Sequence, residues 1–141
     1  MTPATSAMVQ RINAIAVIAF GLLIIAGLVP ELAAPMVLLT EGALWPQQAP
    51  PALTEPVTRL FLATTGGLTV GLGAALWLLA TRLAPHQPAL ARGMASWIVV
   101  TWYLADSGAC ALAGAYGNVV LNTLFAAVLL APMVLPSRHA A

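Results

Sequence analysis

The sequence predicts an all-α protein, an integral membrane bundle of four transmembrane helices. Of the 141 residues, 61% are hydrophobic and only 6% are charged, whereas soluble domains carry about 25% charged residues. Four apolar segments each have roughly the 20 residues needed to cross about 30 Å of hydrocarbon. Backbone polar groups in lipid must be paired internally, so these segments are expected to be helices. They cover about 12–30, 57–82, 94–114 and 118–136 of a single domain, residues 1–141.

The first span, about 12–30, contains no charge and follows Arg11. Its apolar run is longer than that of a normal signal peptide, and no small-x-small cleavage pattern follows it, so it is expected to be retained. A Pro-rich outer loop, 31–56, comes next, and its five prolines, together with Pro30 just before it, prevent one continuous helix. Within it, 36–45 can lie at the membrane surface as a short amphipathic turn. An irregular cap over the bundle is favoured here over a gated lid.

The second span carries small residues at every fourth position: Ala63, Gly67, Gly71 and Ala75. Residues with this spacing share one helix face and let another helix approach closely. That helix belongs either to the same bundle or to another subunit. The bundle is favoured, because four packed helices need close crossings of their own.

The third and fourth spans are joined by the short turn 114–117, which predicts an antiparallel helical hairpin. The third span contains Asp106, the only acidic residue inside an apolar segment. An ionisable residue within a membrane is expensive and is by default a candidate functional site. The turn should bring Asp106 within reach of Asn122.

The candidate polar cluster around Asp106 also includes Tyr103, three residues earlier, Asn118, which shares a helix face with Asn122, and Arg59. Arg59 opens the second helix on the same side of the membrane and is a possible ion-pair partner of Asp106. Three roles stay open for the cluster: a structural contact between helices, a ligand- or proton-handling site, and a contact with another subunit. The structural contact is favoured, since a buried polar pair can fix helix register without doing chemistry.

Basic residues orient the bundle. Arg11 precedes the first span, Arg82 and Arg92 flank the second connection, and Arg138 lies in the tail. The positive-inside rule then puts both termini in the cytoplasm and 31–56 outside, in a multi-pass protein of the bacterial inner membrane. Arg59 is the exception to this pattern.

Several chemistries lack their residues. The single Cys110 excludes an internal disulfide and a cysteine-based metal site. His86 and His139 lie in a loop and in the tail, so no histidine pair at helical spacing could bind haem or zinc. No catalytic constellation is evident, and we expect no metal and no cofactor. A net charge of +1 gives no indication of a nucleic-acid partner.

Two segments carry a family resemblance: TTGGLTVGLGAALWLL (64–79), followed by a basic loop, and the hairpin WYLADSGACALAGAYGNVVLN (102–122). With these segments the layout resembles the small four-helix bacterial membrane proteins of the DoxX-like and DUF4345-like groups. The resemblance implies a fold only, and no functional residue is carried over from it.

The sequence favours a non-catalytic protein, an accessory or scaffolding subunit of a larger bacterial membrane complex, with the bilayer and other membrane subunits as partners. One alternative is a small transporter or ligand-binding bundle that uses the polar cluster. A third hypothesis, ranked below both, is a lipid- or quinone-directed membrane enzyme with Asp106 as acid or base. An enzyme is thus not the favoured class.

Overall fold

The computed structural model describes residues 3–46 and 53–134, and within these ranges it contains helices and no strand. In chain order the elements are α1 (Pro3–Ala26), η1 (Pro30–Leu32), α2 (Ala34–Leu44), α3 (Pro56–Leu78), η2 (Leu79–Leu83), α4 (Pro88–Leu112) and α5 (Tyr116–Val134). The all-α prediction is therefore confirmed. Three helical stretches are long and apolar enough to cross a membrane: Thr5–Ala26, Pro56–Leu83 and Tyr116–Val134. These stretches indicate a membrane protein.

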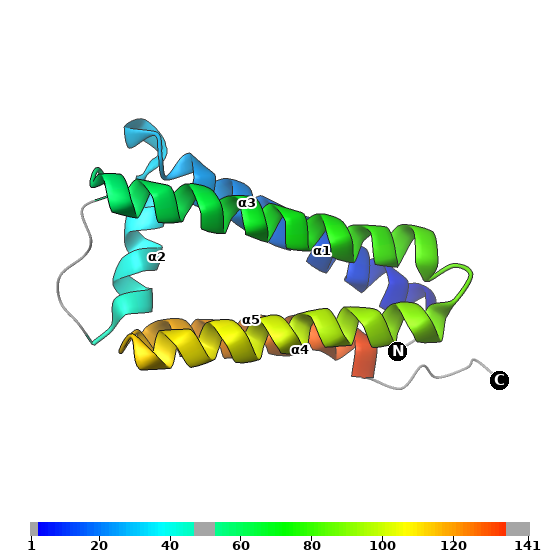
Figure 1. Cartoon of the computed structure of the whole chain (residues 1–141). Coiled ribbons are helices and arrows are strands. Elements are labelled where there is room, and N and C mark those ends of the chain that lie inside the picture. Colours follow the sequence, from blue (N-terminus) through cyan, green and yellow to red (C-terminus); the bar gives the residue numbers. More distant parts are fainter. Residues whose placement is uncertain (1–2, 47–52, 135–141) are drawn as a thin grey trace.

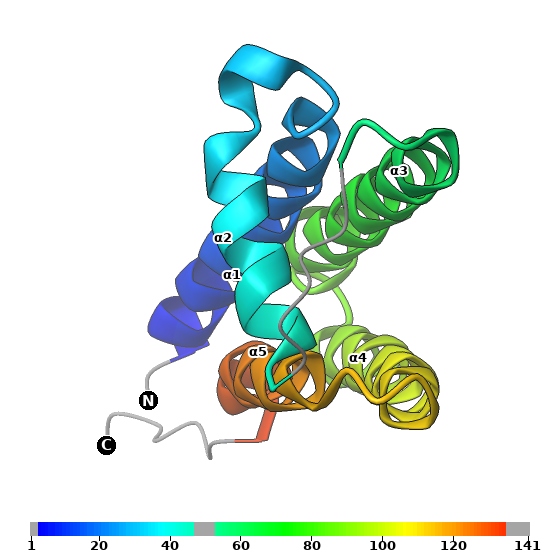
Figure 2. The same ribbon diagram turned by 90° about the vertical axis from the view of Figure 1, so that its left-hand side faces the viewer.

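The four long helices form two layers. Figure 1 shows α1 beside α3 in one layer and α4 beside α5 in the other, with each pair antiparallel. The layers meet where α1 contacts α5 and where η2, a π-helical turn that extends α3, contacts α4. The short helix α2 crosses from the first layer to the second at one end of the bundle (Figure 2).

Prolines mark where helices begin. Proline occupies one of the first two positions of η1, α2, α3 and α4, where the N–H that it lacks has no intrahelical partner anyway. The first helix differs from the predicted span 12–30. It begins already at Pro3, because the residues before Arg11 are compatible with a helix, and it ends at Ala26, ahead of Gly27 and Pro30. Residues 135 and 136 of the predicted fourth span lie outside the described residues.

The predicted irregular cap is partly a helix. Within 36–45, the sequence up to Leu44 belongs to the 11-residue helix α2, and Trp45 follows as its C-cap, largely exposed. The side chain of Met36 is buried against Ile24 of α1 and Leu62 of α3. This contact anchors α2 to the first layer, while its other end reaches α5.

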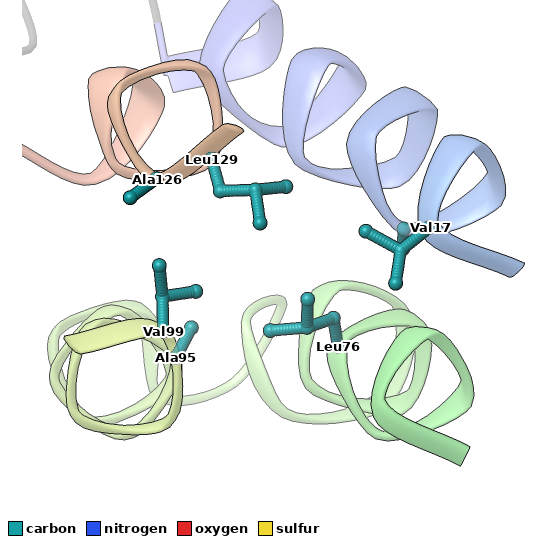
Figure 3. Close-up of a cluster of buried hydrophobic side chains, with 7 residues drawn as sticks. Val17, Leu76, Ala95, Val99, Ala126 and Leu129 are labelled. Atoms are coloured by element: carbon teal, nitrogen blue, oxygen red, sulfur yellow. The ribbon is translucent and has the colours of Figure 1, made fainter. Parts of the chain in front are cut away.

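The main core lies between the layers, nearer the end where η2 meets α4. Its buried side chains are small or branched and come from all four long helices: Ala14, Val17, Leu76, Ala95, Val99, Ala126 and Leu129. Figure 3 shows Leu76 and Val17 approaching from the first layer and Val99 and Leu129 from the second. Apolar burial at this point holds the two layers together.

Glycines let α1 and α3 approach each other closely. A Cβ added to Gly66 would lie 2.9 Å from the carbonyl oxygen of Gly21, and a Cβ added to Gly73 would lie 2.7 Å from the backbone nitrogen of Ile18. Both distances are shorter than van der Waals contact, so the two backbones pack directly on each other.

The predicted stripe lies on a different face of α3 from these glycines. Ala63, Gly67 and Gly71 are exposed, Ala75 is half-buried, and a Cβ added to Gly67 or Gly71 would meet no atom within 4 Å. The favoured interpretation, in which the stripe packs inside the bundle, is therefore wrong for Gly67 and Gly71. The helix has small residues on two faces, and Gly66 and Gly73 are the ones that pack against α1, Gly66 on Gly21 and Gly73 on Ile18.

Candidate functional site

The turn between α4 and α5 sets the register of the candidate site. Gly114 has φ = 74°, a left-handed conformation that glycine adopts without steric cost at the end of a helix. The N–H of Ala115 then donates to the carbonyl of Cys110 at 2.9 Å, which closes the end of α4. Because the turn is short, residues that precede it on α4 face residues that follow it on α5.

The central contact joins Asp106 to Asn122. The Nδ2 group of Asn122 donates to Oδ2 of Asp106 at 2.5 Å and to Oγ of Ser107 at 3.3 Å. Asn122 and Ser107 are each only 8% exposed, and Asp106 is half-buried. The structure thus brings Asp106 to Asn122, as the hairpin register predicted.

Two further contacts lie on either side of this pair. Nδ2 of Asn118 donates to Sγ of Cys110 at 3.0 Å, and the hydroxyls of Tyr103 and Thr123 lie 3.1 Å apart. The Thr123 hydroxyl donates its single proton to the carbonyl of Val119, so Tyr103 is the donor to Thr123. The three contacts form one polar seam along the hairpin, made of Tyr103, Asp106, Ser107, Cys110, Asn118, Asn122 and Thr123.

Arg59 does not belong to the polar seam. Its Nη1 donates to the carbonyl oxygen of Leu28 at 3.0 Å, so the predicted ion pair with Asp106 is not formed. Leu28 lies just beyond α1, where backbone carbonyls lack helical partners. Arg59 satisfies one of these carbonyls and ties the start of α3 to the end of α1.

Ser107, Cys110 and Thr123 also belong to the seam, although the candidate cluster predicted from the sequence does not include them. Ser107 and Cys110 follow Asp106 by one and four residues, and Thr123 follows Asn122 by one, so an antiparallel alignment of the two helices would have found all three.

The contact of Gly117 with α2 was also not predicted from the sequence. Its N–H donates to the carbonyl of Trp45 at 3.1 Å, and a Cβ there would overlap the carbonyl oxygen of Gly42. Only a glycine therefore lets α2 rest on the start of α5.

A second set of polar contacts joins α1 to α5. Nδ2 of Asn13 donates to the carbonyl of Val128 at 3.0 Å, and Oγ of Ser6 donates to the carbonyl of Pro132 at 2.7 Å. Both acceptors lie near the end of α5, which continues through Pro132. These contacts hold α1 of the first layer against α5 of the second layer.

The seam offers little for chemistry. Its one carboxylate is hydrogen-bonded to an amide, and among residues 3–46 and 53–134 no three His, Cys, Asp or Glu side chains gather as metal ligands would. A cleft opens on the outer face of α4 and another at the end of the bundle, and Asp106 lines neither of them. The arrangement is that of a clasp between two helices.

Comparison with known proteins adds no assignment: no family model, no curated protein and no solved structure matches the chain. The resemblance to the DoxX-like and DUF4345-like groups thus stays a prediction.

Proposed function

We propose that the chain is a non-catalytic integral membrane protein with four crossings, which serves as an accessory or scaffolding subunit of a larger bacterial membrane complex. The observation that carries this proposal is the uncovered face of α3, formed by Ala63, Gly67 and Gly71. Small residues on a lipid-facing surface are typical of places where another transmembrane helix packs closely. Among residues 3–46 and 53–134, no helix packs on the two glycines, which leaves this face available to a helix of a partner subunit.

The path of the chain supports four crossings. Figure 1 shows α3 and α5 running in the same direction. The helix α4, which comes between them in the sequence, runs the opposite way. If α3 and α5 both cross the bilayer, the chain must come back across it, and α4 is the only element that links them. Its 25 residues extend for about 37 Å at 1.5 Å per residue, enough for the hydrocarbon layer of about 30 Å. Arg92 and Asp106 make it less apolar than the other three.

The placement of charges supports an orientation in the bacterial inner membrane with both termini in the cytoplasm. Arg11, Arg82 and Arg92 belong to the end of the bundle where α1 begins and η2 meets α4, whereas Glu31, Glu41 and Glu55 belong to the α2 end. Basic residues concentrate on the cytoplasmic side of membrane proteins. The α2 end would then face outward.

A purification in mild detergent tests the subunit role. The wild-type protein is expected to come down with larger membrane partners in fixed stoichiometry, and Gly67→Leu together with Gly71→Leu is expected to release them. Gly108→Leu on α4 is the matched control, because a Cβ at Gly108 also meets no atom within 4 Å. Recovery of the wild-type chain alone, as a monomer or as a homo-oligomer, would contradict the proposal.

The half-buried position of Asp106 favours the transporter or ligand-binding bundle as a second candidate. The substitution Asp106→Asn distinguishes the subunit role from the transporter role. It removes the charge of residue 106, while its amide oxygen can still accept the hydrogen bond from Asn122. In a subunit whose seam is a clasp, this variant keeps its folded yield and its partners. In a transporter it keeps the yield but loses uptake or proton coupling in reconstituted vesicles.

A further inference from the structure

The end of the bundle opposite α2 holds a cleft that the seam does not explain. It has a volume of about 370 Å³ and lies between the start of α1, η2 and the start of α4. This volume falls within the range of about 300–1,000 Å³ that small-molecule sites occupy. Alanines and prolines form most of its wall, and its polar side chains are Ser6, Gln10, Arg11 and Arg92.

The two guanidinium groups in this cleft come from different helices. Arg11 belongs to α1 and Arg92 to α4, and neither has a hydrogen-bond or ion-pair partner within the part of the chain that the structure describes. Each guanidinium carries five N–H donors and stays protonated, so both are available to an anion. Ser6 and Gln10 are already engaged, since Gln10 donates to Ser6 and Ser6 donates to Pro132.

In the part of the chain that the structure describes, no carboxylate competes for these guanidinium groups. None of the residues that line the cleft is acidic. Three of the four acidic residues of the sequence lie at the α2 end, and Asp106 follows Arg92 on the same helix by 14 positions, which is about 21 Å at 1.5 Å per residue. Within residues 3–46 and 53–134, no carboxylate therefore neutralises the positive charge of the cleft.

We propose that the Arg11–Arg92 cleft binds a phosphate group. Guanidinium groups bind phosphate oxygens through paired hydrogen bonds, and two of them from separate helices can hold one phosphate from both sides. In a membrane protein, basic pockets between helices at the cytoplasmic surface hold anionic lipid headgroups. A free phosphate ion offers the same oxygens. The inference does not depend on the subunit role, because a protein without partner subunits could bind phosphate equally well.

Native mass spectrometry of the full chain in detergent, titrated with phosphatidylglycerol or phosphatidylcholine, tests the proposal. Retention of phosphatidylglycerol should exceed that of phosphatidylcholine. Arg11→Gln and Arg92→Gln should each weaken it about tenfold or more, the effect of losing a hydrogen bond between charged groups. Arg82→Gln is the matched control, since Arg82 lies at the same end, exposed, but does not line the cleft. It should change retention less than twofold.

Inorganic phosphate without lipid distinguishes the two sources. If phosphate raises the thermal stability of the protein in a way that requires Arg11 and Arg92, and displaces phosphatidylglycerol at millimolar concentration, the site takes free phosphate. If it does neither while phosphatidylglycerol stays bound, the ligand is the lipid headgroup. Equal weakening by Arg82→Gln and Arg92→Gln would overturn the proposal, because diffuse surface charge would then account for binding. Arg92→Lys keeps the charge but cannot form paired hydrogen bonds, so it should weaken binding less than Arg92→Gln does. An unchanged midpoint of thermal unfolding in each variant controls for a loss of fold.

Discussion

At the scale of single residues, polar side chains in this bundle complete hydrogen bonds that prolines remove. The carbonyl of Val128 would normally accept from the N–H of residue 132, but Pro132 has none. The carbonyl of Pro132 also lacks a helical donor, because it lies in the last turn of α5, which ends at Val134. These two carbonyls are the ones that Asn13 and Ser6 reach from α1. In lipid, where water cannot replace the missing donor, such pairing is required.

This pairing predicts that Asn13 and Pro132 are energetically coupled. Asn13→Ala should lower the free energy of unfolding in mixed micelles by about 0.6–1.7 kcal/mol, the range of interhelical hydrogen bonds in membranes. In a Pro132→Ala background the cost should shrink, because the restored N–H of residue 132 can pair with Val128. A double-mutant cycle measures the coupling directly.

Thr64→Ala provides the control for that cycle. The Thr64 hydroxyl donates only to carbonyls of its own helix, those of Leu60 and Phe61, so its loss should be nearly neutral and independent of Pro132. An Asn13→Ala cost that is the same with and without Pro132 would contradict the proline explanation.

At the scale of the helix, the face of α3 that packs is decided by single glycines. Gly66→Ala would place a Cβ 2.6 Å from Cγ1 of Ile25 and 2.9 Å from the Gly21 carbonyl oxygen, and overpacking of this kind costs about 1–3 kcal/mol. Gly67→Ala, one position along, meets only open space and should gain up to about 1 kcal/mol from helix propensity. Thermal unfolding in detergent should therefore show a lowered midpoint for Gly66→Ala and an unchanged or raised one for Gly67→Ala. The reverse order would mean that the predicted stripe, and not Gly66, packs inside the bundle.

The same helix shows where prediction from sequence reaches its limit. The α4–α5 hairpin could be predicted, because a short turn fixes which residues of the two helices face each other, and Asp106 with Asn122 followed from that. The α1–α3 contact could not, because a long connection leaves rotation and register free, and either small face of α3 could pack. The sequence gives no distances, so it leaves Asp106 as a possible partner of Arg59, whereas the guanidinium binds the carbonyl of Leu28.

At the scale of the whole molecule, charge separates along the bundle axis. The end where α1 begins and η2 meets α4 carries Arg11, Arg82 and Arg92, and the α2 end carries the three glutamates with Arg59 as the only described basic residue. Figure 1 shows the beginning of α1 and the end of α5 at the same end of the bundle. An even number of membrane crossings would place them there. Three crossings, with α4 lying along the surface, would separate them.

Labelling by a membrane-impermeant thiol reagent distinguishes four crossings from three. In a Cys110→Ser background, which keeps an acceptor for Asn118, single cysteines replace three exposed residues: Glu41, His86 and Tyr116. His86 and Tyr116 flank α4, so they should label from opposite sides of the membrane if α4 crosses. Glu41 and Tyr116 should react in intact cells, and His86 only after permeabilisation, because basic residues surround it. If the cysteines at positions 86 and 116 are labelled from the same side, α4 does not cross the membrane. If all three cysteines are labelled from the side opposite to the expected one, only the orientation is contradicted.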